Sequence, residues 1–281
     1  MHLQRGGRKD NLSGQRRVVM ETTVFGETNK SGKPCVVSVG VFDGLHLGHA
    51  RIIAQNVALA HRNGWMSVVM TFSVNPKMAK GSMKALKPLS SMRFFDEMLD
   101  KAGVDQHCII DFSDDMSKLT GEEFVAMLCT SYSVRAMVVG TSFRCGNPSS
   151  SAGVSNLEGL LSKYTSSASL VVVPSVFVEG DEVSSSLIRR CLLTGDLDKA
   201  SRLLGRAYSL DLRDLPYESS QNRLLYSVRA LGQLLPPEGL YMVEATASGA
   251  LAKCRLCVSE DHLALELPVR MIPDGITFLG E

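Results

Sequence analysis

Residues 39–53, VGVFDGLHLGHARII, join an apolar run to a helical pattern through a loop that contains three glycines and two histidines. The apolar run VVSVGVF (36–42) predicts a buried strand. The residues that follow, HARIIAQNVALAHRNG (49–64), have apolar side chains at helical spacing and end in a glycine that predicts a helix C-terminus. A strand, a glycine loop and a helix in this order are typical of the first unit of a parallel α/β sheet.

The same alternation continues to about residue 205. Apolar runs predict further strands at 67–72, 107–112, 135–140 and 169–174. Periodic segments predict helices at 91–103, 121–131, 155–164, 184–195 and 196–205, and we expect Thr120 and Glu123 to form a capping box for the second of them. Strands that are apolar throughout indicate a doubly wound parallel sheet with helices on both faces. Ligands of such folds bind beyond the carboxyl ends of the strands, where the 40–49 loop would lie.

The sequence divides into three parts. Residues 1–19 are basic and polar and are expected to be a disordered lead-in, and we hypothesise that Met20 is the physiological start. Residues 20–205 form the α/β domain. Residues 206–281 contain short, partly alternating runs separated by turn residues, which predict a small all-β, barrel-like domain.

The composition excludes several classes of protein. The chain has 281 residues, of which 44% are hydrophobic and 21% charged, as in globular proteins, and its net charge of +1 gives no overall attraction to nucleic acid or membrane. No apolar run reaches the roughly 18 residues that a membrane helix needs. Seven scattered cysteines favour free thiols, and Cys254 with Cys257 lacks the second pair that a zinc site needs. We expect a cytoplasmic monomer that binds no nucleic acid and no membrane.

The two histidines of the opening stretch allow three interpretations: capping and packing, metal binding, or phosphate binding. His46 and His49 would share one face of the expected helix. The glycines at 40, 44 and 48 permit close approach of the backbone to a ligand. A helix N-terminus offers unpaired N–H groups and a partial positive charge to a phosphate. The spacing suggests no third metal ligand, so phosphate is favoured.

A second polar cluster lies at the other end of the α/β region, in GDEVSSSLIRRCLLTGD (180–196). Ser184, Ser185 and Ser186 stand at an expected helix start, and Arg189 follows one turn later. Hydroxyl groups, backbone N–H groups and a guanidinium together suit a polyphosphate. Serine capping beside a surface arginine is the alternative. Together the two stretches predict a phosphate site with two opposing sides.

At this point the chain resembles a known family, the bacterial bifunctional riboflavin kinase/FMN adenylyltransferases, or prokaryotic FAD synthetases. The resemblance covers residues 36–208 and rests on five motifs in order: GVFDGLHLGH (40–49), TFSVNP (71–76), VVGTSFRCG (138–146), VSSSLIR (183–189) and GDLDKASRLLGRAY (195–208). It implies a Rossmann-like nucleotidyltransferase fold. It also implies transfer of AMP from ATP to FMN, giving FAD and pyrophosphate, with Mg²⁺ held by the phosphates.

The resemblance assigns roles to individual residues. The implied catalytic residues are His46, His49 and Arg189. The implied ATP-binding residues are Gly40, Phe42, Asp43, Gly44, Gly48, Gly140, Ser184, Ser185 and Ser186. The implied flavin-binding residues are Phe72, Asn75, Pro76 and Arg144. No protein ligand to a metal is implied.

Several positions depart from the family pattern. Val74 and Asn75 stand where the family has proline and histidine, and Ser142 and Cys145 replace an Asp or Asn and an aromatic residue. Because these stretches belong to the nucleotide and flavin sides, two alternatives stay open. One is a nucleotidyltransferase with a different phosphorylated acceptor, and the other is a non-catalytic flavin or nucleotide binder.

The C-terminal part departs further from the family. LLYSVRAL (224–231) stands where the kinase domain of the family has G-F-P-T-A-N, whose proline and threonine help to bind ATP and Mg²⁺. Little sequence follows Val243 to supply the strand that carries the kinase's catalytic glutamate. We therefore expect a degenerate kinase module without riboflavin kinase activity.

Overall fold

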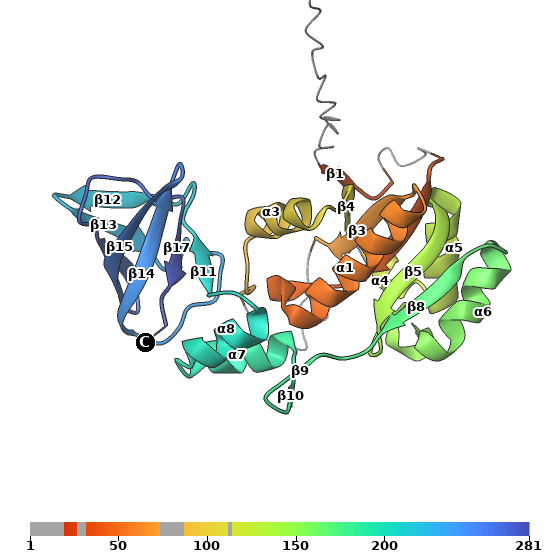
Figure 1. Cartoon of the computed structure of the whole chain (residues 1–281). Coiled ribbons are helices and arrows are strands. Elements are labelled where there is room, and N and C mark those ends of the chain that lie inside the picture. Colours follow the sequence, from red (N-terminus) through yellow and green to blue (C-terminus); the bar gives the residue numbers. More distant parts are fainter. Residues whose placement is uncertain (1–19, 27–31, 74–86, 112–113, 281) are drawn as a thin grey trace, which may run out of the picture.

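The computed structural model describes residues 20–26, 32–73, 87–111 and 114–280. The expected lead-in at 1–19 and the expected flavin-binding residues Asn75 and Pro76 lie outside these ranges. The described chain has an α/β unit and a β unit, with two short helices between them (Figure 1).

The α/β unit is built on a six-stranded sheet in which all neighbouring strands are parallel. The strand order is β1-β4-β3-β2-β5-β8. The bounds are β1 Glu21–Val24, β2 Pro34–Val39, β3 Met66–Phe72, β4 Gln106–Ile110, β5 Ser133–Gly140 and β8 Ser169–Val173. The chain moves outward from β2 through β3 to β4 and then returns to place β5 on the other side of β2. The switch point of the sheet is therefore the carboxyl edge between β2 and β5, which is where such folds bind ligands.

Helices cover both faces of this sheet. The helices are α1 Leu47–Arg62, α3 Met92–Ala102, α4 Asp114–Lys118, α5 Gly121–Ser131 and α6 Val154–Tyr164. Apolar residues of α1 and α3 pack with Val69 and with Val36 on one face. Those of α5 and α6 pack with Val37 and Val68 on the other. Successive strand residues thus enter different cores, which explains why these strands are apolar throughout.

A buried polar contact fixes α1 against the sheet. The Asn56 amide donates to Ser38 Oγ at 2.9 Å and accepts from Ser67 Oγ at 2.7 Å. All three residues are fully buried. Because buried polar groups are costly when unpaired, this network favours one position of α1 on β2 and β3.

Element types agree with the predictions, and several boundaries differ. The strand predicted over 36–42 ends at Val39, because Phe42 has a left-handed conformation (φ 46°) and Asp43–Leu45 form a short 3-10 turn, η1. The strands predicted to end at 112 and 174 end at Ile110 and Val173. The capping box between Thr120 and Glu123 is confirmed. The edge strand β1 and α4 were not predicted.

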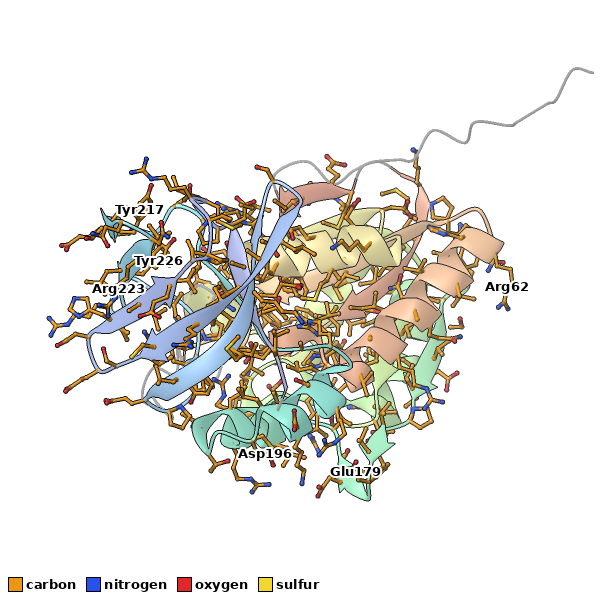
Figure 2. The ribbon with its side chains drawn as sticks, turned by 60° about the vertical axis from the view of Figure 1, so that its left-hand side comes forward. Arg62, Glu179, Asp196, Tyr217, Arg223 and Tyr226 are labelled. Carbon is orange, nitrogen blue, oxygen red and sulfur yellow. The ribbon has the colours of Figure 1, made fainter. Side chains whose placement is uncertain are left out.

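The β unit is a seven-stranded antiparallel sheet of order β11-β17-β14-β15-β16-β13-β12. The bounds are β11 Ser209–Asp211, β12 Tyr217–Ser220, β13 Arg223–Ser227, β14 Gly239–Ala247, β15 Ala250–Val258, β16 His262–Glu266 and β17 Gly275–Phe278. The predicted all-β character is confirmed. Its side chains are drawn in Figure 2, where Tyr217, Arg223 and Tyr226 mark the far end of the unit.

Cys254 and Cys257 both lie on β15. Residues three apart on a strand point to opposite faces, so these two thiols are not arranged as a pair. Among the described residues there is also no helix long and apolar enough to span a membrane.

Two helices connect the units: α7 Ser185–Leu193 and α8 Leu197–Leu204. A short hairpin of β9 Phe177–Val178 and β10 Asp181–Glu182 precedes them. Apolar residues of α7 and α8, among them Ile188 and Leu203, share one hydrophobic core with inward-facing residues of the β unit such as Leu210 and Phe278. The two helices are thus packed against the β sheet as well as against the loop after β2.

The loop after β5 depends on Gly146, the last glycine of VVGTSFRCG. Gly146 has a φ of +84°, and a Cβ atom there would lie 2.2 Å from the backbone nitrogen of Gly121 at the start of α5. We predict that Gly146→Ala lowers the free energy of unfolding by roughly 2–4 kcal/mol in urea denaturation, because backbone cannot move aside as a side chain can. The control is Gly159→Ala in α6, where nothing lies within 4 Å of the added atom. That variant should gain up to about 1 kcal/mol, and equal stability of the two variants would contradict the prediction.

Candidate active site

The loop after β2 places two imidazoles at the start of α1. His46 is the N-cap residue of α1, and its Nδ1 accepts from the backbone N–H of His49 at 3.4 Å. The two rings are stacked, with centroids 3.6 Å apart and an angle of 20° between the planes. The predicted sharing of one helix face is thus confirmed. Because His46 Nδ1 is an acceptor, its proton is on Nε2, which leaves an N–H donor for a ligand.

Aromatic packing orients this pair. Phe42, expected to bind ATP, is buried, and its ring meets the His49 ring edge-on at 5.2 Å. A Cβ atom at Gly40 would lie 3.0 Å from the Phe42 ring, so that glycine allows the ring to fold under the loop. Phe42 therefore supports His49 from the core side.

The start of α7 lies directly beside this loop. Ser184 is the N-cap residue of α7 and accepts from the Leu187 N–H, and Ser185 Oγ donates to the Asp43 carbonyl oxygen at 2.9 Å. A Cβ atom at Gly48 would meet the His46 ring at 3.2 Å and the Val183 carbonyl oxygen at 3.9 Å. The N-termini of α1 and α7 therefore lie next to each other at the loop after β2. Ser186 is exposed beside them.

Arg189 and Asp43 form an ion pair inside this junction. Arg189 Nη2 donates to Asp43 Oδ2 at 2.5 Å, and Nη1 donates to the Lys87 carbonyl oxygen. The other carboxylate oxygen of Asp43 accepts from the Leu89 N–H at 2.8 Å. Both charged side chains are nearly buried, with 12% and 11% exposure. Arg189 thus ties α7 to the loop after β2.

Comparisons with known proteins identify the family of this chain. Residues 28–187 match the family model described as FAD synthetase. The chain belongs to the FAD synthetase family. The bifunctional riboflavin kinase/FMN adenylyltransferase of Listeria monocytogenes is 29% identical to this chain over 175 residues. The match covers 62% of this chain and 54% of that protein. This member of the FAD synthetase family thus spans about half the length of that relative.

Two further similarities support the family and the fold. The FAD synthetase of Listeria monocytogenes is 27% identical over 64% of this chain and 72% of its own length. A crystal structure titled macrolide-efflux protein, from Streptococcus pneumoniae, superposes with a TM-score of 0.78 at 19% identity, covering 92% of this chain and 90% of that one. The latter similarity shows that the arrangement of both units is a known fold.

The histidines of this family member are held neutral. Burial lowers the pKa of His46 to about 4, with a further contribution from the Arg206 guanidinium. Burial, and then the neighbouring His46, hold the pKa of His49 well below its usual range. The Nδ1 atom of His49 is buried, and no hydrogen-bond partner reaches it among the described residues.

This environment predicts a pH dependence of stability. The His46 pKa is about 4 in the folded state against 6.5 for the free side chain. Between these values only the unfolded state takes up the proton, so the stability is complete above pH 6.5 and falls by roughly 3 kcal/mol as the pH drops to 4. His46→Asn, which still caps the helix, should flatten this dependence in urea unfolding measured from pH 7 to pH 4. The exposed His262→Asn is the control, and an unchanged slope in His46→Asn would refute the assignment.

Three more predicted residues lie in the described part of the chain. Gly140 and Phe72 end β5 and β3, and Arg144 begins the short strand β6 (Arg144–Cys145), where its side chain is exposed. The structure thus assembles the histidines and the serines closely. It places Arg144 on a separate loop that is paired with β7 (Ala152–Gly153).

One residue of the site was not predicted. Arg206, from the LLGRAY stretch, donates to the carbonyl oxygens of Gly44 at 2.6 Å and Leu45 at 3.2 Å. Gly205 before it lets the backbone pass so close to Leu47 that a Cβ atom would lie 2.4 Å from that side chain. The one sequence signal was that the arginine stands inside a motif shared with the family.

Proposed function

We propose that this chain transfers AMP from ATP to FMN, giving FAD and pyrophosphate. The observation that carries the proposal is the stacked pair His46–His49 facing the N-terminus of α7, at the switch point of a sheet that belongs to the FAD synthetase family. Two helix N-termini and two imidazoles at one place suit a triphosphate.

The chemistry requires no group of the protein to form a covalent bond. A phosphate oxygen of FMN would bond to the α-phosphorus of ATP while the bond from that phosphorus to the bridging oxygen breaks, and pyrophosphate leaves with the electron pair. The contribution of the chain is to hold the reactants and to stabilise charge. The Nε2–H of His46 and the ring of His49 would donate to phosphate oxygens. Burial keeps the pKa of both imidazoles low. The negative charge of a bound phosphate would raise these pKa values and favour protonation.

Mg²⁺ would be bound by the phosphates of ATP. Asp43, the carboxylate of the histidine loop, already accepts from Arg189 and from the Leu89 N–H. Both of its oxygens thus already have hydrogen-bond partners, and Mg²⁺ commonly takes most of its ligands from phosphates and water.

The role of Arg189 differs from the simple phosphate grip implied by the resemblance. Its guanidinium spans Asp43 and the Lys87 carbonyl oxygen. We propose that it acts mainly by holding the two halves of the site together. Ser184, Ser185 and Ser186 would face the triphosphate, and Phe72, Asn75, Pro76 and Arg144 would form the flavin side.

We propose that riboflavin kinase activity is absent and that the chain works as a cytoplasmic monomer. The support for the first is that β13 (Arg223–Ser227) and the turn after it stand where the kinase motif would be. Size-exclusion chromatography with light scattering tests the second.

The deciding experiment is incubation of the purified chain with ATP, Mg²⁺ and FMN, followed by chromatography of flavins. Formation of FAD with release of one pyrophosphate supports the proposal. Turnover with another phosphorylated acceptor but not with FMN would indicate a different nucleotidyltransferase, and binding of ATP without turnover of any acceptor would indicate a binding protein. Riboflavin in place of FMN tests the kinase: FMN formed from riboflavin would contradict its proposed absence.

A further inference from the structure

A cavity of about 340 Å³ lies between the α/β unit and the β unit. One wall is the face of α3 that carries Phe94 and Met98. The opposite wall is formed by residues of β11, β14 and β17, among them Ile276 of β17. Figure 1 shows α3 beside β11 and β17. The volume lies at the lower end of the range for small-molecule sites, which suits one ring system and is too small for a dinucleotide.

The lining of the cavity includes Arg206, whose guanidinium has no counter-ion among the described residues. Arg206 reaches it from the connection after α8, and its hydrogen bonds all go to the carbonyl oxygens of Gly44, Leu45 and Leu204. In the described part of the chain no carboxylate forms an ion pair with it. Burial also lowers the pKa of Arg206, which shows that its charge is poorly solvated. Partly buried charges are costly unless an opposite charge is near.

The other charged residues of the lining differ in this respect. Arg213 is paired with Asp211 at 2.8 Å and with Glu97 at 2.6 Å, so it needs no further anion. Asp274 accepts from the Ser248 N–H at 2.7 Å. Lys101 is exposed at the rim of the cavity, on the last turn of α3. Arg206 inside and Lys101 at the rim are therefore the two cations of the lining that form no ion pair in the described residues, and Asp274 is a carboxylate that forms none.

The apolar part of the lining is shaped for a ring. Gly275 allows the backbone of β17 to approach α3, since a Cβ atom there would lie 3.0 Å from Phe94 Cζ and 2.9 Å from the Leu210 carbonyl oxygen. The Arg213 guanidinium lies over the ring of Phe94, with 5.1 Å between the Arg213 Cζ and the ring centroid. The ring of Phe94 is thus fixed as a flat apolar wall.

We propose that this cavity binds a small organic anion, with its ring against Phe94 and Met98 and its carboxylate or phosphate group on Arg206, and with Lys101 at the entrance. Such a site is separate from the triphosphate site of the proposed transferase. Arg206 lies between the two, because the same guanidinium holds the Gly44 and Leu45 carbonyl oxygens of the histidine loop.

The test is a ¹⁹F NMR titration of the full chain with 4-fluorophenyl phosphate and with 4-fluorobenzoate, in the presence of saturating ATP and Mg²⁺. At least one of the two anions should bind, and the comparison shows which anionic group the site prefers. Neutral 4-fluorobenzyl alcohol should bind about tenfold more weakly or not at all. Binding of the probe only when ATP and Mg²⁺ are left out would place it in the nucleotide site and overturn the proposal, as would equal binding of the alcohol or no binding at all.

Two variants locate the probe. Lys101→Glu should weaken binding about fivefold or more, because it reverses the charge at the entrance. Its matched control is Arg62→Glu, which reverses an exposed charge on α1, on the side of the molecule away from the β unit (Figure 2), and should leave binding unchanged. Arg206→Met should remove binding, with thermal unfolding measured in parallel to show that the variant folds. Unchanged affinity in Lys101→Glu would overturn the proposal even if Arg206→Met failed to fold.

Discussion

Replacing His49 with alanine should lower the rate of FAD formation by about 10²–10³-fold, which is the usual effect of removing one donor to developing phosphate or oxyanion charge. The ring stacks on His46 with 3.6 Å between the centroids, and its Nδ1 is buried without a partner in the described residues. The loss should appear in kcat and in kcat/KM, and the melting temperature is measured in parallel to separate this loss from a folding defect. Steady-state kinetics with FMN as the varied substrate measures it.

The matched control for this variant is His61→Ala. His61 lies in the last turn of the same helix, where its side chain is half exposed and pairs with Asp105 at the surface. Its removal should leave the rate within about twofold. If His49→Ala retained the full rate, the histidine pair would be structural and the proposed transferase site would be wrong.

Replacing Arg189 with methionine should lower the free energy of unfolding by about 3–5 kcal/mol, because it leaves the Asp43 carboxylate nearly buried without its positive partner. The loss should also reduce transferase activity, since the tie between α7 and the histidine loop is cut. Urea unfolding followed by far-UV circular dichroism measures the first effect.

The neighbouring Arg190→Met provides the control, since Arg190 is exposed on the same helix and should change stability by at most about 0.5 kcal/mol. The double variant Asp43→Asn/Arg189→Met should regain part of the lost stability, because the neutral amide costs less to bury. Equal stability of Arg189→Met and Arg190→Met, together with a lost activity, would show instead that Arg189 acts on the triphosphate directly.

Much of the α/β unit could be predicted from local sequence. Runs such as VVSVGVF and RAMVVG enter two cores at once, so their residues are all apolar, and this pattern identified β2 and β5 correctly. The capping box at Thr120 is a local signal of the same kind. The end of β2 was placed too late because Phe42 looks like another strand residue. Its left-handed conformation depends on the turn that follows and on the space left by Gly40.

The site was predicted less completely, for a related reason. The histidines and serines stand in short sequence motifs and can be recognised from those motifs alone. The ion-pair partner of Arg189 lies 146 residues away in the sequence, and the two acceptors of Arg206 in the histidine loop lie more than 160 away, so no local pattern connects them. The edge strand β1 has only four residues, and three of them are polar. It exists because β4 offers an unpaired edge, which is a property of the assembled sheet.

The core that α7 and α8 share with the β sheet has a consequence for how the chain melts. Residues of both helices and of the β unit belong to one hydrophobic cluster, which also includes Leu89 from the segment before α3. The β unit is hydrogen-bonded to that segment, because the Leu234 N–H donates to the Pro88 carbonyl oxygen. Neither unit can lose its packing without exposing apolar surface of the other. We therefore expect a single calorimetric transition whose van't Hoff enthalpy equals its calorimetric enthalpy. Two resolved transitions would show that the units unfold independently.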